Sequence, residues 1–301
     1  MSTPSATINA EELQRPLRAC ASGQLPPNMA LTHMIALADT REALEVALAA
    51  GQRREITPEA AERIAAAVAL WRATPGAWNV VKSVLTVADH GAMAASTQEW
   101  AARFDRAARI SPEASAAVYS LGRAGLAEAS ASSIVRGLQA WGLTGQHRAA
   151  LDLGCGCGRL LAALSQHMRR IVGIDVSAGM LTAARLRCRG ITNVALVQTS
   201  GQDLSAFSDR VFDLVVAVDV FPYLVSCKGD LAQRHIGEAF RVLAPGGSLV
   251  ILNYAYGKDA EADAAQAIAH ADRAGFRLVR TGCNDFELWD GRTFHFRRSE
   301  A

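Results

Sequence analysis

The feature that most constrains the fold is a glycine-rich stretch in the middle of the chain, residues 151–159, with the sequence LDLGCGCGR. It follows an apolar run at 149–153 that predicts a strand, and it opens a segment at 159–167 that predicts a helix. Glycines allow a tight turn and let a ligand approach main-chain atoms that a Cβ would shield. The stretch therefore predicts a ligand-binding loop between a strand and a helix.

The alternation of strands and helices continues to the C-terminal part of the chain. Helices are expected at 178–189 and 231–243, and continuous apolar runs indicate strands buried on both faces. Such alternation predicts a mostly parallel sheet between helices, an α/β fold. Residues 289–293 (WDGRT) predict a hairpin between two antiparallel strands. The predicted strands are residues 149–153, 171–175, 194–197, 214–218, 248–252, 276–280 and 293–297.

The preceding 148 residues have a different character and predict helices only. Thr57-Pro58-Glu59, the pair Ser96 and Glu99, and Ser111-Pro112-Glu113 are helix N-terminal patterns that combine a capping residue with an acid in the first turn. We therefore expect an all-α N-terminal domain (1–95), lid or linking helices (96–148) and an α/β core (149–301).

Composition and charge exclude several classes of protein. The 31 basic and 29 acidic residues give a net charge of +2, which argues against a nucleic-acid partner. No apolar run reaches the ~18 residues of a membrane span, and residues 1–10 lack the apolar core of a secretory signal. The six scattered cysteines do not suggest a disulfide framework. We expect a cytoplasmic protein without a membrane association.

An acid follows the loop at an informative distance. Asp175 lies 21 residues after Gly154, at the end of the second predicted strand, where a carboxylate can accept both hydroxyl hydrogens of an adenosine ribose. The alternative is a strand-end aspartate that caps the next helix. The spacing Gly154-x-Gly156-x-Gly158 differs from the Gly-x-Gly-x-x-Gly of dinucleotide folds and, with the C-terminal hairpin, opposes a nicotinamide-dependent oxidoreductase.

At this point the sequence resembles the class I S-adenosylmethionine-dependent methyltransferases. Besides the loop and 172–177, the matching stretches are GQDL (201–204), FDLVV (212–216) and RVLAPGGSL (241–249). The resemblance covers roughly residues 149–297 and is strongest to the small-molecule branch that includes quinone-biosynthesis C-methyltransferases. It implies a Rossmann-like sheet of seven strands, mostly parallel with an antiparallel C-terminal hairpin, behind an all-α N-terminal domain. It also implies S-adenosylmethionine as cofactor and a small-molecule methyl acceptor.

The resemblance further implies cofactor-binding roles. Asp152 and the glycine loop face the methionine end, and Asp175 binds the ribose. Val176 and Met180 pack along the adenine, although Met180 can equally be a helix core residue. Residues 202–204 approach the adenine amino group, unless Asp203 only caps a loop. The expected cofactor-binding residues are Tyr119, Asp152, Gly154, Cys155, Gly156, Gly158, Asp175, Val176, Met180, Gln202, Asp203, Leu204, Asp219 and Tyr223.

Candidate catalytic residues follow the fourth and fifth predicted strands: Asp219, Tyr223 and Tyr254. Methyl transfer is an in-line displacement that depends mainly on positioning, and a general base helps only when the acceptor must lose a proton. His235 is a further possible base, but its helix favours a surface or packing role. The sequence VFPY at 220–223 lacks the Asn-Pro-Pro-Tyr or Asp-Pro-Pro-Tyr pattern of nucleobase or glutamine methylation.

No metal site is expected, because Cys155 and Cys157 lie inside a tight loop where their side chains cannot converge with distant ligands. An alternative function is a non-catalytic S-adenosylmethionine-binding module with a helical protein-interaction domain. The N-terminal helices are open to three roles: a homodimer contact, a substrate pocket or a protein-partner surface. The acceptor and the methylated atom (O, N, S or C) are left open by the sequence.

Overall fold

The computed structural model describes residues 10–53, 56–89, 96–257, 259–283 and 285–300. Its N-terminal part is helical, as predicted, and Thr40, Thr57, Ser96 and Ser111 cap their helices by accepting a backbone N–H three residues on. The elements are α1 (Ala10–Ala21), α2 (Pro27–Leu37), α3 (Arg41–Gln52), α4 (Pro58–Arg72), α5 (Ala77–Ala88), α6 (Thr97–Ala108), α7 (Pro112–Ala116), η1 (Val118–Ser120) and α8 (Ala124–Ala140).

The C-terminal part is a seven-stranded sheet in the order β3-β2-β1-β4-β5-β7-β6. All pairings are parallel except those of β7, which runs antiparallel to both β5 and β6. The predicted Rossmann-like methyltransferase sheet behind N-terminal helices is therefore confirmed. The strands are β1 (Gly145–Leu153), β2 (Met168–Asp175), β3 (Val194–Gln198), β4 (Phe212–Val218), β5 (Leu243–Leu252), β6 (Phe276–Cys283) and β7 (Arg292–Arg298).

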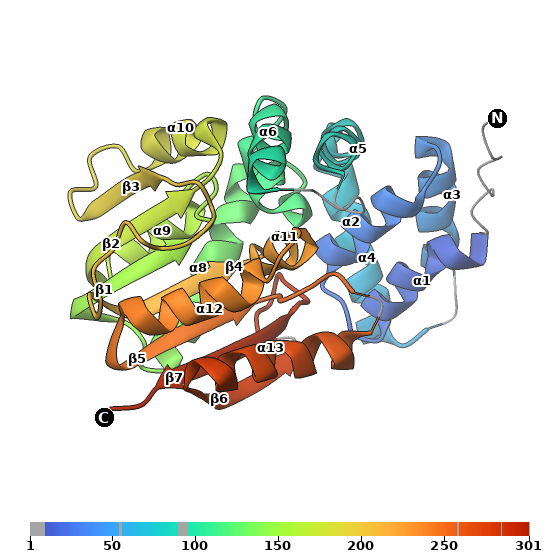
Figure 1. The fold of residues 1–301 in the computed structure, drawn as a ribbon. Coiled ribbons are helices and arrows are strands. Elements are labelled where there is room, and N and C mark those ends of the chain that lie inside the picture. The colour runs from blue at the N-terminus through green and yellow to red at the C-terminus, as the bar shows by residue number, and fades with distance from the viewer. Residues whose placement is uncertain (1–9, 54–55, 90–95, 258, 284, 301) are drawn as a thin grey trace.

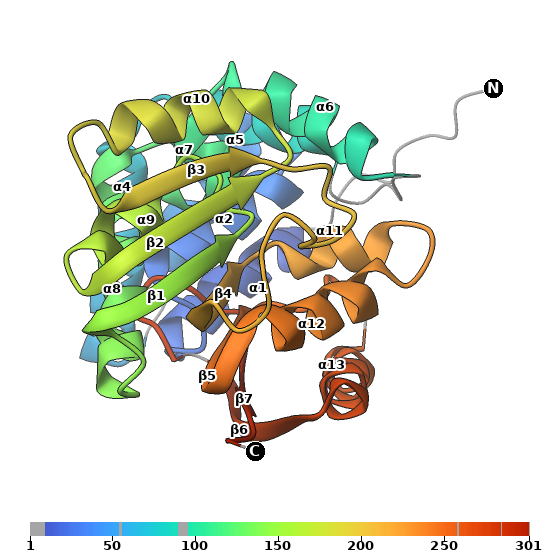
Figure 2. The ribbon, with the colours of Figure 1, turned by 60° about the vertical axis from the view of Figure 1, so that its left-hand side comes forward.

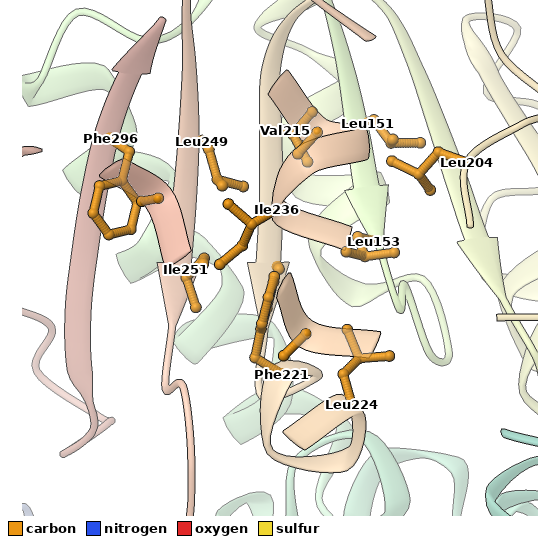
Figure 3. Close-up of a cluster of buried hydrophobic side chains, with 14 of the residues drawn as sticks. Leu151, Leu153, Leu204, Val215, Phe221, Leu224, Ile236, Leu249, Ile251 and Phe296 are labelled. Atoms are coloured by element: carbon orange, nitrogen blue, oxygen red, sulfur yellow. The ribbon is translucent and has the colours of Figure 1, made fainter. Parts of the chain in front are cut away.

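Helices cover both faces of the sheet because alternate residues of the buried strands point to opposite sides. One face packs against α11 (Phe221–Ser226), α12 (Leu231–Val242) and α13 (Ala260–Ala274), and the other against α8, α9 (Arg159–Ser165) and α10 (Ala178–Arg187). On the first face Ile236 of α12 and Phe221 of α11 lie over the strand residues Val215, Leu249 and Ile251 (Figure 3).

Two local predictions differ from the structure. The fifth strand was predicted at 248–252, but β5 already begins at Leu243 and includes Pro245-Gly246-Gly247. Gly246 has φ +73° and the β4–β5 register shifts there, so the three residues form an irregularity inside the strand. The expected five-residue hairpin at 289–293 is also longer, because β6 ends at Cys283 and β7 begins at Arg292.

The N-terminal helices α1–α5 share a hydrophobic cluster of their own, built around Leu17, Leu31, Ile35, Leu48 and Val81. They lie beyond the carboxyl ends of the parallel strands (Figure 1), and Figure 2 shows α6 next to α10 over the β3 side of the sheet. None of the helices within the described ranges is long and apolar enough to cross a membrane. This arrangement places helical side chains over the sheet edge where ligands bind in α/β proteins.

Candidate active site

A cavity of about 670 Å³ lies at the carboxyl ends of the parallel strands. Its floor comes from the glycine loop and from the ends of β2, β4 and β5, while α2, α5, α6, α7 and η1 supply the opposite wall. Residues 289–291, just before β7, close one end. The cavity therefore combines residues from nearly the whole length of the chain.

The glycine loop needs its glycines for two different reasons. Gly154, Gly156 and Gly158 all have positive φ (72°, 53° and 75°), which disfavours other residues. Gly154 and Gly156 line the cavity, as expected. Gly158 does not: a Cβ there would lie 3.1 Å from the Cβ of Ala184, so this glycine lets the loop pack against α10.

The two loop cysteines are buried thiols. Cys155 lines the cavity, and burial raises the pKa of its thiol well above the usual value. No group of three or more His, Cys, Asp or Glu residues within the described ranges is arranged to hold a metal ion.

Asp175 lies where the sequence predicts it, at the end of β2 and facing the cavity. Its Oδ2 accepts a hydrogen bond from the backbone N–H of Gly156 at 2.8 Å, and its Oδ1 accepts one from Ser177 at 2.8 Å. Burial raises the pKa of the carboxyl group, and these N–H groups oppose the rise. A carboxylate has about four lone-pair positions, so two remain for a ligand.

The residues expected at the adenine end are only partly brought together. Val176 and Met180 line the cavity together with Thr97, Thr199 and Gly201. Residues 202–204, which the resemblance places at the adenine, do not line the cavity. Gln202 donates through Nε2 to Thr97 Oγ1 (2.8 Å), and Leu204 is buried in the core.

Asp203 also points away from the cavity. Its Oδ1 accepts hydrogen bonds from the Ser205 hydroxyl (2.6 Å) and the Ser205 backbone N–H (3.1 Å), and these bonds lower the pKa of its carboxyl group. The geometry is that of a local turn-stabilising aspartate, the alternative left open by the sequence.

Asp152 lies in β1 below the loop and is 2% exposed. Its Oδ2 has no hydrogen-bond partner among the described residues, which marks it as open to a ligand. Burial raises the pKa of this carboxyl group to about 7, partly opposed by the charge of Arg159 and increased by that of Asp175.

Arg159, the first residue of α9, is a cavity residue that sequence reasoning did not assign. Its guanidinium donates to Tyr119 Oη (3.0 Å) and to Ser130 Oγ (3.3 Å), and it joins no ion pair within the part of the chain that the structure describes. The carboxylates of Asp219 and Asp152 are near enough to interact with its charge. The only hint in the sequence was its position directly after the loop. Tyr119, expected as a lid residue, lines the cavity and orients this guanidinium.

Asp219 follows β4 and has φ +54°, a rare backbone conformation for aspartate. Its Oδ1 accepts from Asn253 Nδ2 and its Oδ2 from Trp289 Nε1, both at 3.2 Å. Burial raises the pKa of the carboxyl group to about 6, with Arg159 acting in the opposite direction. The site thus holds a carboxylate that can exchange a proton near neutral pH.

An aromatic cluster stands beside Asp219. Tyr223 packs edge-on against Trp100, Phe104 and Tyr256, with ring centroids 4.7, 5.0 and 6.2 Å apart. All four side chains line the cavity. Burial raises the pKa of the Tyr223 hydroxyl, so it remains protonated near neutral pH.

Tyr254, the third expected catalytic residue, is not part of the cavity. Its ring is buried in the sheet core, and its hydroxyl contacts His270 Nδ1 of α13 at 2.9 Å. His235 borders the cavity but is 1% exposed, its Nδ1 lies 2.9 Å from the Leu231 carbonyl, and burial lowers its pKa. Both side chains have packing roles.

The N-terminal wall was not predicted residue by residue. Met29, Thr32 and His33 of α2 face the cavity, and His33 Nε2 lies 3.8 Å from Asp290 Oδ2. Asn28 Nδ2 donates to the backbone carbonyls of Tyr119 (3.3 Å) and Leu288 (3.1 Å). These bonds connect α2 to η1 and to the segment just before β7.

The strand order, the glycine loop and Asp175 define a nucleoside-binding α/β protein with a methyltransferase sheet. Comparison with known proteins identifies part of the chain: residues 151–251, about a third of it, match the model of the methyltransferase domain. This part of the chain therefore carries a methyltransferase domain, as the resemblance implied.

The similar curated proteins described next each match about a third of this chain. Nodulation protein S of Rhizobium tropici is 35% identical over 103 residues, which are 34% of this chain and 41% of that protein. A demethylmenaquinone methyltransferase of Tropheryma whipplei is 34% identical over 106 residues, 35% of this chain and 41% of that protein. Ubiquinone biosynthesis O-methyltransferase of Bradyrhizobium is 30% identical over 102 residues, 34% of this chain and 38% of that protein. The chain thus spans about two fifths of these relatives.

Among solved structures, an S-adenosylmethionine-dependent methyltransferase from Aquifex aeolicus aligns with a TM-score of 0.47 and 19% identity. The alignment covers 58% of this chain and 93% of that one.

Proposed function

We propose that this protein transfers the methyl group of S-adenosylmethionine to a small-molecule acceptor within the cavity. One observation carries the proposal: the glycine loop, Asp175, Asp219 and the aromatic cluster all line a single cavity. A cofactor seated on the loop and an acceptor beside Asp219 would share this space. Quinone-biosynthesis relatives support a small-molecule acceptor.

The residues present fit the cofactor. A Cβ at Gly156 would lie 3.2 Å from the Ala116 Cβ and 3.3 Å from the Met180 Cε, so only glycine leaves room beside the loop, and the buried Oδ2 of Asp152 has no hydrogen-bond partner among the described residues. Asp175 would accept the ribose hydroxyl hydrogens through its remaining lone pairs. Val176 and Met180 would pack along the adenine, with Thr199 and Gly201 at its edge. Asp152 would accept from the ammonium group, and Arg159 would hold the carboxylate.

Bound S-adenosylmethionine supplies an electrophilic methyl group on a positively charged sulfur. The chain's own contribution is to bind, orient and exclude water. Trp100, Phe104 and Tyr223 give the reacting region apolar walls, while Asp219, fixed by two N–H donors, can take up a proton from the acceptor.

We assign cofactor binding to the core, residues 149–301, and propose that the helical parts, residues 1–95 and 96–148, share acceptor recognition with the core residues around Asp219. The contribution of α2 to the cavity wall supports this division. A homodimer through the N-terminal helices stays a prediction. The cysteines of the described chain are free thiols, which agrees with the predicted cytoplasmic location.

Isothermal titration calorimetry with S-adenosylmethionine tests the cofactor part. We expect micromolar affinity in the wild type and a large loss in Asp175→Asn. A search for labelled methyl products in metabolite pools tests the transfer. Tight binding without any product would favour the non-catalytic binding module, and absence of binding would refute both.

A further inference from the structure

The end of the cavity around Asp219 is rich in aromatic side chains. Trp100 and Phe104 of α6, Tyr223 of α11, Tyr256 after β5 and Trp289 before β7 all line the cavity. Trp100 and Trp289 are almost fully buried, and Tyr256 is about half exposed at the rim. Aromatic rings meet one another edge-on or offset-stacked, and such contacts stabilise a bound aromatic ring beyond its area alone. The walls therefore favour an aromatic acceptor.

The charges of this end disfavour an anionic acceptor. Asp219 and Asp290 both line it, and the Asp290 carboxylate lies 3.8 Å from His33. Within the described ranges the cavity is lined by one arginine and no lysine. That arginine, Arg159, is held by Tyr119 and Ser130 and is assigned above to the cofactor carboxylate. A negatively charged acceptor would meet two carboxylates with no cation left to pair with it.

The polar groups around Asp219 match a hydroxyl better than an amine. Asn253 and Trp289 donate to the two carboxylate oxygens and fix their direction, and each oxygen keeps a free lone pair. Asn253 Nδ2 has a second hydrogen to donate. Asp219 can thus accept a hydrogen bond from a bound molecule, and Asn253 can donate one to it. This combination suits a hydroxyl group, which has one hydrogen and an oxygen. An amino group brings two hydrogens.

We propose that the acceptor is an uncharged aromatic compound with a hydroxyl group, which is methylated on oxygen while Asp219 takes its proton. The proposal rests on the methyltransferase function proposed above. The bond from the hydroxyl oxygen to the methyl carbon forms as the bond from that carbon to the sulfonium sulfur breaks. The sulfur keeps the electron pair and becomes a neutral thioether. The hydroxyl proton passes to the Asp219 carboxylate and from there to water.

Three probes with one ring system test the acceptor class: 2-naphthol, 2-naphthylamine and 2-naphthoate. Each is titrated into the protein saturated with S-adenosylhomocysteine, and binding is followed by calorimetry and by quenching of tryptophan fluorescence. We expect 2-naphthol to bind at least about 10-fold more tightly than 2-naphthoate and to give 2-methoxynaphthalene with S-adenosylmethionine. Equal binding of the naphthoate, no binding of the naphthol, or methylation of the naphthylamine alone would overturn the proposal.

A second experiment isolates the role of Asp219. In Asp219→Asn, methylation of 2-naphthol should fall by about 100-fold or more, because the proton acceptor is lost. The affinity of Asp219→Asn for 2-naphthol, measured with S-adenosylhomocysteine bound, should fall by less than about 10-fold, because the amide oxygen can still accept the hydroxyl hydrogen. The exposed Asp272→Asn on α13 is the matched control and should retain both the rate and the affinity. A loss of affinity as large as the loss of rate would refute proton transfer to Asp219.

The two proposals fail differently. If the wild type does not bind S-adenosylmethionine, the proposed function fails. If it binds the cofactor and rejects 2-naphthol, only the acceptor class fails.

Discussion

Asp175 and Gly156 are joined by a hydrogen bond of 2.8 Å from the backbone N–H of the loop glycine to the carboxylate at the end of β2. The residue expected to hold the ribose therefore also holds the loop on which the methionine part would rest. Binding and loop geometry are coupled through one side chain, and any substitution of Asp175 acts on both.

Replacement of Asp175 by asparagine should weaken S-adenosylmethionine binding by about 10- to 100-fold, since hydrogen bonds to a charged group contribute about 1.5–3 kcal/mol each. The melting temperature of the unliganded protein should also fall, because an amide nitrogen cannot accept the Gly156 or Ser177 N–H. Calorimetry and thermal unfolding measure the two effects, with Asp272→Asn as control. Unchanged affinity would exclude Asp175 from the cofactor site.

Replacement of Arg159 by methionine should weaken binding of S-adenosylhomocysteine by about 10- to 100-fold, because the carboxylate loses a buried charged partner. Methylthioadenosine lacks that carboxylate, so its affinity should change little. Calorimetry with each ligand measures the two affinities separately. A parallel loss for both would show that Arg159 supports the loop rather than the carboxylate. Tyr119→Phe should give a smaller loss with the same ligand preference, since Tyr119 orients the guanidinium.

Asp152 predicts a pH dependence of stability. Its carboxyl pKa is about 7 in the folded protein, against the ordinary 3.8, mainly because of burial, with Arg159 and Asp175 as the charged neighbours. The folded state therefore binds this proton more tightly than the unfolded state, and the resulting stability is lost as the pH rises through about 7. Asp219, with a carboxyl pKa of about 6, contributes in the same direction.

Asp152→Asn removes the charge and should raise the free energy of unfolding of the unliganded protein at about pH 8 by roughly 2–4 kcal/mol. At about pH 5 the difference should shrink to roughly 1–2 kcal/mol, because Asp152 is then protonated in the folded wild type and ionised only in the unfolded state. Urea unfolding at both pH values gives the difference. If the difference in free energy of unfolding between the two proteins does not grow with pH, Asp152 does not have a raised pKa in the folded protein.

Asn28 predicts a stability effect at the contact between α2 and the segments around Tyr119 and Leu288. Its amide donates to the carbonyls of Tyr119 and Leu288, so Asn28→Asp would place a carboxylate against two acceptors. We expect a loss of about 2–4 kcal/mol, and about 1–2 kcal/mol for Asn28→Leu, which removes the donors without adding charge. Urea unfolding measures both. A loss in the leucine variant equal to that in the aspartate variant would indicate packing rather than hydrogen bonding.

The predicted site residues that line the cavity owe their position to the sequence immediately around them. The glycine loop and Asp175 lie at strand ends, where strand prediction alone fixes their position on the sheet. Asp219 and Tyr223 are of the same kind. Tyr254 follows a strand in the same way, yet its ring turns into the core toward His270, while its neighbour Asn253 faces the cavity. The direction of a side chain after a strand depends on loop conformation, which the pattern does not encode.

The parts that were missed depend on contacts between distant segments. Arg159 is a cavity residue because Ser130 and Tyr119, 29 and 40 positions earlier, hold its guanidinium. The α2 residues were read only as part of a helix, because no local pattern shows which face of a helix meets a sheet assembled from later residues. The strands themselves were predictable since burial on both faces leaves apolar runs.

The bond from Asn28 to Leu288 spans 260 positions, and it has a consequence for the order in which the protein is built. During synthesis the helices α1–α5 leave the ribosome well before residues 285–291. The glycine loop can form before they appear, but the acceptor end of the cavity lacks one wall until then. A nascent chain that has already folded its cofactor loop therefore still presents an open aromatic surface to the cell.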